Sequence, residues 1–321
     1  MGVPTLNPVP APIHHAAVYG SDNEFLAMAL PFIRGGIAAG EPVLAATTPA
    51  NLELLTSALG EDAAQFDQAE TVFFGPRPPQ RVAAFEKYAR RRGIGQRIRI
   101  LAEPSWAGRT ATEISDWQRM EAGLNLLLES TGIWMICPYD SRQLPGPIID
   151  SARRTHPALV AGTTTRQSPS YSDPVSYAFG HDGPLPPPPG SAPLLPATTR
   201  LPDIRRFAAR QAAAAHLGDG SASLMTVAVH ETAVYLKNAT GSPVTVRIWQ
   251  QHGAIVCDLH AHGPAAPGPF DGFRMPDLDQ SRPDDGLWYA RQFSTRLDLR
   301  ATADGIQARL QMGPLALAES T

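Results

Sequence analysis

The sequence predicts two domains, an α/β domain with a parallel sheet and then a smaller α+β domain. Residues 13–180 alternate between apolar, strand-like runs and helix-like segments, as chains with a parallel sheet do. Residues 183–199 (GPLPPPPGSAPLLPATT) hold too much proline for a helix or a central strand. The residues that follow run helix, helix, hairpin, helix, hairpin. A length of 321 residues also suits about two domains.

Apolar periodicity predicts the elements of the first domain. In residues 24–36 the apolar side chains recur at helical spacing, and Gly35-Gly36 is predicted to end that helix. Compact apolar runs flanked by such helices indicate strands that are buried on both faces of a parallel sheet. The further predicted helices cover residues 49–59, 79–92 and 113–130, and the predicted strands cover residues 15–19, 42–47, 71–74, 98–102 and 133–137.

Two hairpin patterns distinguish the second domain. His252-Gly253 separates strands at 244–250 and 254–260, and Asp304-Gly305 separates strands at 296–301 and 305–312. Helices are predicted at 201–217, 223–238 and 286–294. The predicted organisation is a flexible arm (1–12), the first domain (13–180), a proline-rich linker (181–200) and the second domain (201–315).

Composition excludes several classes of protein. A net charge of -3 argues against a nucleic-acid binder, and the basic stretch from Arg90 to Arg99 suits a solvated helix end and strand entry. No apolar run reaches the roughly 18 residues of a membrane helix, and residues 1–15 lack the shape of a signal peptide. Cys137 and Cys257 lie far apart in the sequence, each within an apolar run, which favours buried free thiols in a reducing cytoplasm. We therefore expect a cytoplasmic protein that makes no contact with membranes.

The first domain carries a long, ordered series of motifs. It begins with HHAAVY at 14–19 and PFIRGGIAAGEPVL at 31–44. Further matches are Glu103-Pro104, Trp106, Trp117, Glu121, Asn125, CPYD at 137–140, His156-Pro157 and Tyr171. This text resembles the MEDS sensory domain of bacterial and archaeal regulators. The resemblance implies a sensory role and a fold related to the RecA/KaiC-type ATPases.

A phosphate-binding loop would lie after the first strand, where the sequence reads Tyr19-Gly20-Ser21-Asp22-Asn23-Glu24. Such a loop needs glycines for close backbone approach and a lysine for charge. Here there is no lysine, and two carboxylates would repel phosphate. We expect no ATP hydrolysis at this turn and a helix-capping role for Asp22.

Open α/β sheets bind ligands at the carboxyl ends of their strands. Candidate residues for a small-molecule effector site follow from this rule. They are His14, Tyr19, Glu103, Trp106, Tyr139 and Asp140. The alternative is that Tyr139 and Asp140 form a loop network and that Trp106 only packs.

Residues 201–312 resemble the anti-sigma serine/threonine kinases, which share the GHKL (histidine-kinase-like) ATPase sandwich. In that family an N-E-x-x-x-N helix holds Mg²⁺ and positions the reacting group. Here Glu231 matches, but His230 and Tyr235 replace the two asparagines. A phenol is a poor ligand for Mg²⁺, which prefers compact oxygen ligands in octahedral array.

The other two nucleotide motifs of the family are altered as well. Gly263 is retained, but Ala261 stands where the family has its adenine-reading Asp. Gly286 is retained before Leu-Trp, but Asp284 replaces the first glycine of the phosphate turn. The resemblance therefore implies a vestigial nucleotide site, and we expect no cofactor there. His260 and His262 share a strand face, but with no evident third ligand we expect no metal site.

Three functions follow. The first is a regulatory protein of the anti-sigma-factor type, without catalysis, that senses a small effector and binds a sigma factor or an anti-anti-sigma protein. The second is an active serine/threonine kinase that uses ATP, Mg²⁺ and Glu231 in an atypical site. The third is a ligand-responsive transcription regulator, although no DNA-binding motif stands out and no direct nucleic-acid contact is expected. A homodimer stays an open alternative.

Overall fold

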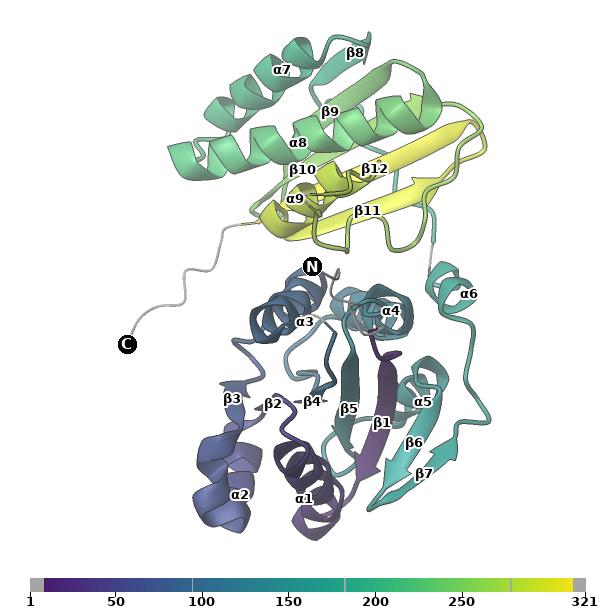
Figure 1. The fold of residues 1–321 in the computed structure, drawn as a ribbon. Helices are drawn as coiled ribbons and strands as arrows, with labels where there is room; N and C mark the ends of the chain where they lie inside the picture. Colours follow the sequence, from purple (N-terminus) through teal and green to yellow (C-terminus); the bar gives the residue numbers. More distant parts are fainter. Residues whose placement is uncertain (1–8, 94, 182, 278, 314–321) are drawn as a thin grey trace. The chain divides into compact units, whose positions relative to one another are not determined.

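The computed structural model describes residues 9–93, 95–181, 183–277 and 279–313. They form two compact units, an N-terminal unit that ends at His181 and a C-terminal unit whose described residues start at Gly183 (Figure 1). The first is a mixed α/β unit with a sheet that is mostly parallel. The second is built on an antiparallel sheet.

The sheet of the N-terminal unit has the order β3-β2-β4-β5-β1-β6-β7. Its strands pair in parallel, except that β7 runs antiparallel to β6. The strands are β1 (Ile13–Tyr19), β2 (Val43–Thr47), β3 (Asp67–Glu70), β4 (Ile98–Ala102), β5 (Ile133–Asp140), β6 (Ala158–Ala161) and β7 (Thr164–Gln167). This order places the carboxyl ends of β1, β2, β4 and β5 at one edge of the sheet.

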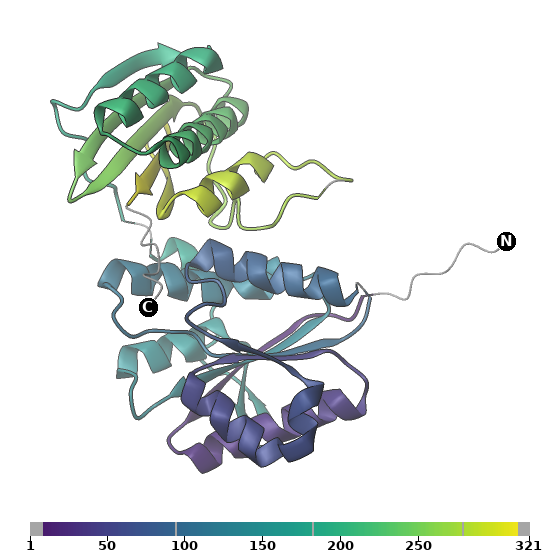
Figure 2. The ribbon, with the colours of Figure 1, turned by 90° about the vertical axis from the view of Figure 1, so that its left-hand side faces the viewer.

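Helices cover both faces of this sheet. Figure 2 shows α1 and α2 on one side and α3 and α4 on the other. The helical segments are α1 (Asp22–Ala38), α2 (Pro49–Leu59), the 3₁₀ turn Gly60–Gln65, α3 (Pro78–Arg92), α4 (Ala111–Leu127), α5 (Gly146–Thr155) and α6 (Pro174–Phe179). The elements β6, β7, α5 and α6 were not predicted from the sequence.

The prediction that Gly35-Gly36 ends the first helix is wrong, because α1 continues to Ala38. Gly36 instead allows close packing, since a Cβ there would lie 2.9 Å from the Cδ atom of Arg99. The predicted cap is also corrected. Ser21 caps α1 by accepting a hydrogen bond from the amide of Glu24 at 3.2 Å.

The prediction of a strand at residues 71–74 is wrong. The third strand is Asp67–Glu70, and the chain turns immediately after it. The apolar residues that suggested a strand are exposed in that turn, Val72 to 47% and Phe73 to 73%. A short polar strand such as DQAE is tolerated because β3 is an edge strand.

The C-terminal unit is a two-layer sandwich. Its sheet has the order β11-β12-β10-β9-β8, and α7, α8 and α9 lie over one face (Figure 1). The elements are β8 (Leu194–Thr198), α7 (Leu201–Ala214), α8 (Asp219–Thr240), β9 (Val244–Gln251), β10 (Ala254–His262), α9 (Asp285–Phe293), β11 (Arg296–Ala301) and β12 (Gly305–Met312). The two predicted hairpins therefore form, β9 with β10 and β11 with β12.

The predicted linker is shorter than expected. Its last residues form β8, which pairs with β9 in the second sheet. Pro196 removes a backbone donor from this strand, but an edge strand tolerates the loss because one side of it has no partner. Among the described residues of the predicted linker, 181, 183–193 and 199–200 have neither helix nor strand.

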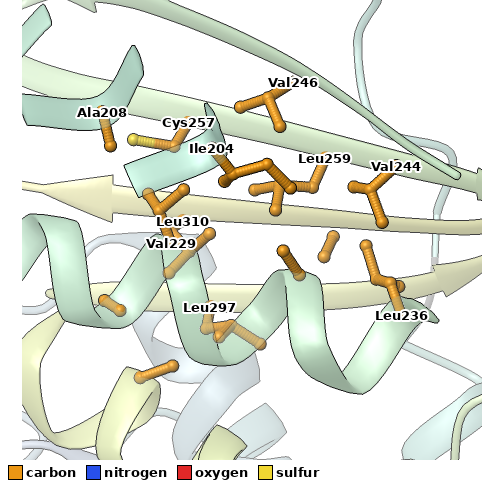
Figure 3. Close-up of a cluster of buried hydrophobic side chains, with 14 of the residues drawn as sticks. Ile204, Ala208, Val229, Leu236, Val244, Val246, Cys257, Leu259, Leu297 and Leu310 are labelled. Carbon is orange, nitrogen blue, oxygen red and sulfur yellow. The ribbon is translucent and has the colours of Figure 1, made fainter. Parts of the chain in front are cut away.

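Side chains along β10 alternate between the core of the C-terminal unit and the opposite face of its sheet. Cys257, Leu259 and Ala261 are buried in the core cluster, whereas Asp258 pairs with Arg309 outside it. Figure 3 shows Cys257 and Leu259 among side chains from α7, α8 and the neighbouring strands. These partners include Ile204, Ala208, Val229, Leu236, Val244, Val246, Leu297 and Leu310.

Candidate functional site

The N-terminal unit has a cavity of about 830 Å³ at the carboxyl ends of β1, β2, β4 and β5. Its volume lies in the range of small-molecule sites. The apolar walls come from side chains such as Leu54, Ile114, Leu144 and Ile148, together with Trp106. We call this cavity the strand-end pocket.

The polar floor of the strand-end pocket is built around the buried carboxylate of Glu103. Tyr19 donates its hydroxyl proton to Glu103 Oε1 at 3.2 Å, and the Asn51 amide donates to Oε2 at 2.9 Å. Thr47 also donates to Oε2, and Asn51 donates to the Tyr19 oxygen at 3.0 Å. We call these four residues the Glu103 network. Burial and the neighbouring Glu103 raise the pKa of Tyr19, which keeps its hydroxyl protonated as a donor.

Trp106 lines the pocket and has a buried indole N–H without a hydrogen-bond partner among the described residues. The side chain is 7% exposed. Its ring lies 6.2 Å from that of Tyr139 and 6.5 Å from that of Trp117, so packing fixes its position. A ligand acceptor that reached this N–H would satisfy a buried donor that otherwise costs stability.

Asp140 is held at the pocket rim by Arg142. The guanidinium donates to both Asp140 oxygens at 2.9 Å and to Asp22 at 2.8 Å. Burial works to raise the pKa of Asp140, but hydrogen bonds from Arg142 and Gln143 outweigh it, and the pKa lies below its ordinary value. Asp22 is therefore an ion-pair partner rather than the helix cap that the sequence suggested.

The turn after β1 is already occupied by the protein's own carboxylate. The amide of Gly20 donates to Glu24 Oε2 at 2.6 Å. Because backbone amides of this turn would have to bind phosphate in a P-loop, the carboxylate fills the position that an anion would need.

Two predicted site residues do not line the strand-end pocket. Side chains alternate along β1, so His14, five residues before Tyr19, belongs to the opposite sheet face. There its Nδ1 lies 3.3 Å from Asn125 Oδ1. Tyr139 is 1% exposed and packs edge-on against His156, with 5.8 Å between the rings. Tyr19, Glu103, Trp106 and Asp140 do line the pocket.

The sequence analysis missed Thr47 and Asn51. Thr47 is the last residue of β2, and Asn51 lies in the first turn of α2. The strand-end rule that selected Tyr19 applies equally to Thr47, so this signal was present in the sequence.

Two residues that the sequence comparison placed in a vestigial nucleotide site, Tyr235 and Asp284, form hydrogen bonds with the loop between β10 and α9. Tyr235 donates to Asp271 Oδ2 at 2.5 Å, and burial is the main cause that raises the pKa of this phenol. Asp284 accepts from the amide of Gly272 at 2.8 Å. A Cβ on Gly286 would overlap Glu231 Oε2, so the carboxylate of Glu231 lies directly against Gly286.

The other residues compared with these motifs, Ala261, Gly263 and His230, contact neighbouring parts of the C-terminal unit. Ala261 is fully buried in the core of the sandwich. Gly263 has a φ of 151° and packs against Thr240, where a Cβ would meet Thr240 Cβ at 3.0 Å. His230 lies 3.5 Å from Arg205 through its Nδ1, and burial lowers its pKa.

His260 and His262 share one face of β10, as predicted, but the structure supplies a third residue. Asp304 lies 3.3 Å from His260 Nε2 and 3.0 Å from His262 Nδ1. Asp304 lies in the predicted turn, and pairing of β12 with β10 brings this turn back to the end of β10, a long-range contact that no local pattern indicates. The side chains of His262 and Asp304 are more than half exposed, which suits a solvated ion-pair cluster.

Within the described ranges, none of the helices combines the length and the hydropathy needed to cross a membrane.

Residues 13–157 match the family model described as "MEDS: MEthanogen/methylotroph, DcmR Sensory domain". The match covers the strands and helices that form the strand-end pocket. A search of curated proteins finds no match for the chain. The segment that forms the strand-end pocket is therefore similar to a MEDS sensory domain, and a signal-sensing regulatory role is the function that this family suggests.

Proposed function

We propose that this protein is a ligand-responsive regulator whose N-terminal unit, a relative of RecA/KaiC-type folds, binds a small organic molecule in the strand-end pocket. The observation that carries the proposal is the pocket itself, a cavity of about 830 Å³ inside the segment that matches a sensory domain. Apolar walls with a few convergent polar groups are typical of small-molecule sites.

The side chains that line the pocket limit which classes of ligand can bind there. Glu103 keeps about one carboxylate lone pair beyond the three that its network uses, and the buried indole N–H of Trp106 has no partner among the described residues. Arg142 pairs with both Asp22 and Asp140 but offsets only one of their two charges, so the lining keeps an acidic excess to which Glu53 and Glu103 also contribute. We expect a neutral or cationic molecule that carries both a donor and an acceptor, such as an alcohol or an amine. Phosphate compounds would be repelled.

Filling the pocket tests this proposal. A panel of small alcohols, amines and other neutral organic molecules is screened for stabilisation of the intact protein in thermal unfolding. A ligand at 100 times its Kd stabilises the folded state by about 2.7 kcal/mol. Leu54→Trp places a large ring in the pocket wall and is expected to abolish the stabilisation by every hit.

Val175→Trp is the matched control, because Val175 is 36% exposed on α6 and does not line the pocket. It should leave each shift unchanged. Hits that stabilise Leu54→Trp as strongly as the wild type would contradict binding in the strand-end pocket.

For the C-terminal unit we propose a GHKL-type sandwich that binds a protein partner, a sigma factor or an anti-anti-sigma protein, rather than a nucleotide. Its helical layer over an antiparallel sheet supports the fold assignment. The contacts of Tyr235 with Asp271 and of Glu231 with Gly286 support the loss of nucleotide chemistry, since these groups are engaged within the protein. Ligand binding would act by favouring one state of the protein over another.

Calorimetry with ATP, in the presence and absence of Mg²⁺, distinguishes this proposal from the active-kinase alternative. We expect no heat up to millimolar nucleotide. Micromolar, Mg²⁺-dependent binding that disappears in Glu231→Ala would establish the kinase alternative instead.

A further inference from the structure

Four ionisable side chains meet on the other face of the N-terminal sheet, outside the strand-end pocket. They are His14 on β1, Glu121 on α4, Cys137 on β5 and His156 at the end of α5, and we call them the buried quartet. Each is at most 5% exposed. His14 Nε2 lies 3.4 Å from Cys137 Sγ and 3.6 Å from Glu121 Oε2, and His156 Nε2 lies 3.5 Å from the same oxygen.

Hydrogen bonds fix the tautomer of both imidazoles. The Asn125 amide nitrogen donates to the carbonyls of Ala122 at 3.0 Å and Thr155 at 2.8 Å, so its oxygen faces His14 as an acceptor. The Nδ1 of His14 therefore carries the proton. His156 Nδ1 lies 2.8 Å from the carbonyl of Ala152 and is likewise the protonated nitrogen.

Both Nε2 atoms consequently turn lone pairs toward a carboxylate oxygen. Glu121 Oε2 and His156 Nε2 have no hydrogen-bond partner among the described residues. Acceptors that face one another in a dry interior are unfavourable unless a cation or a proton lies between them.

We propose that the buried quartet binds a divalent metal ion, with Zn²⁺ as the best fit. A thiolate, two imidazoles and a carboxylate are ligands that zinc takes in four-coordinate sites. Zn–N and Zn–S bonds of roughly 2.0 and 2.3 Å put tetrahedral ligand atoms about 3.3–3.6 Å apart. Three of the six separations among the ligand atoms of the quartet are 3.4, 3.5 and 3.6 Å, and all six lie within 4.8 Å.

Charge and outer contacts agree with this assignment. The Cys137 thiolate and the Glu121 carboxylate neutralise the ion, and the thiol proton leaves to solvent as the metal binds. Metal-bound histidines usually donate their second N–H to a carbonyl or a carboxylate, as His14 and His156 do toward Asn125 and Ala152. All four ligands come from the protein, so the ion would stabilise the fold rather than bind substrate.

The rival arrangement uses protons in place of the metal, with the Cys137 thiol donating to His14 and a protonated Glu121 donating to His156. An acid–imidazole hydrogen bond should close to about 2.7–3.2 Å, so the 3.5 Å separation of Glu121 and His156 disfavours it. The ion would also lie near the strand-end pocket, because Tyr139 packs between His156 and Trp106.

Metal analysis of the intact, reduced protein tests the proposal. Protein purified without chelator is expected to hold stoichiometric zinc by inductively coupled plasma mass spectrometry. Cells grown with Co²⁺ should yield protein with a thiolate-to-cobalt charge-transfer band and intense visible bands of four-coordinate Co²⁺. His156→Gln should lose the metal, and Cys137→Ala should lose the charge-transfer band.

Two controls locate the site. Cys257→Ala removes the other buried cysteine, and His262→Ala breaks the exposed His260–His262–Asp304 cluster. Both should keep the metal and the charge-transfer band. Wild-type protein with neither zinc nor the cobalt band would overturn the proposal in favour of protons, and this result requires no variant to fold. A band that survives in Cys137→Ala would overturn it as well.

Discussion

Arg309→Met is expected to lower the free energy of unfolding of the C-terminal unit by about 3–5 kcal/mol, because it leaves a buried carboxylate without its counter-charge. Asp258 on β10 faces Arg309 on β12, and its Oδ2 accepts from Nε at 2.8 Å and from Nη2 at 2.5 Å. Asp258 is 5% exposed and Arg309 6%. Urea unfolding followed by amide exchange of the β10 and β12 backbone would measure the loss.

A pH series sharpens this test. Burial raises the pKa of Asp258 and Arg309 opposes that rise, so in the folded variant the pKa moves further up. When the pKa of an acid is higher in the folded state than in the unfolded state, the folded protein binds more protons. The free energy of unfolding therefore falls as the pH rises from the ordinary aspartate pKa through the raised value. The defect of Arg309→Met should therefore be largest at neutral pH and should shrink on acidification.

Arg206→Met is the matched control. Arg206 also pairs with an aspartate, Asp203, but its side chain is 64% exposed, and surface pairs contribute about 0–1 kcal/mol. The double variant Asp258→Leu/Arg309→Met should recover much of the stability, since apolar residues can replace a buried pair. A loss below 1 kcal/mol for Arg309→Met, or one independent of pH, would contradict a buried, charge-neutralising role.

Glu103→Ala is expected to destabilise the N-terminal unit by about 1–3 kcal/mol and to abolish stabilisation by pocket ligands. The change removes the acceptor of Tyr19, Thr47 and Asn51 and leaves their donors in a buried site. Thermal unfolding with and without a screened ligand measures both effects.

Glu53→Ala separates this network from a general effect of charge. Glu53 also lines the strand-end pocket, but it is exposed and takes no part in the Glu103 network. It should change the free energy of unfolding by less than about 0.5 kcal/mol. Equal effects of the two substitutions would show that the network does not hold the pocket together.

Local pattern accounts for the elements that could be predicted from the sequence. Strands β11 and β12 lie where alternation and the Asp304-Gly305 turn placed them, because both signals act within a few residues. Strands β3 and β7 were missed because DQAE and TTRQ carry no apolar face, and edge strands need none. The helix end predicted at Gly35-Gly36 was wrong because a glycine pair can allow close packing as well as end a helix.

The residues of the candidate site likewise divide into those that a local rule could predict and those that it could not. The strand-end rule found Tyr19, Glu103 and Trp106, and it failed for His14 and Tyr139, whose side chains lie on the other sheet face. The buried quartet joins two strands, a helix and a helix end that are far apart in the chain. Glu121, Cys137 and His156 stood among the resembling motifs, but no spacing in the sequence indicates that they meet.

Hydrogen–deuterium exchange of the intact protein with a screened ligand tests the central claim, that the strand-end pocket is the sensing site, most directly. The account predicts that the ligand slows exchange at the β2–α2 junction around Thr47 and Asn51 and at residues 103–107, which form the floor and wall of the pocket. Protection confined to the C-terminal unit, or none at these segments at saturating ligand, would contradict it.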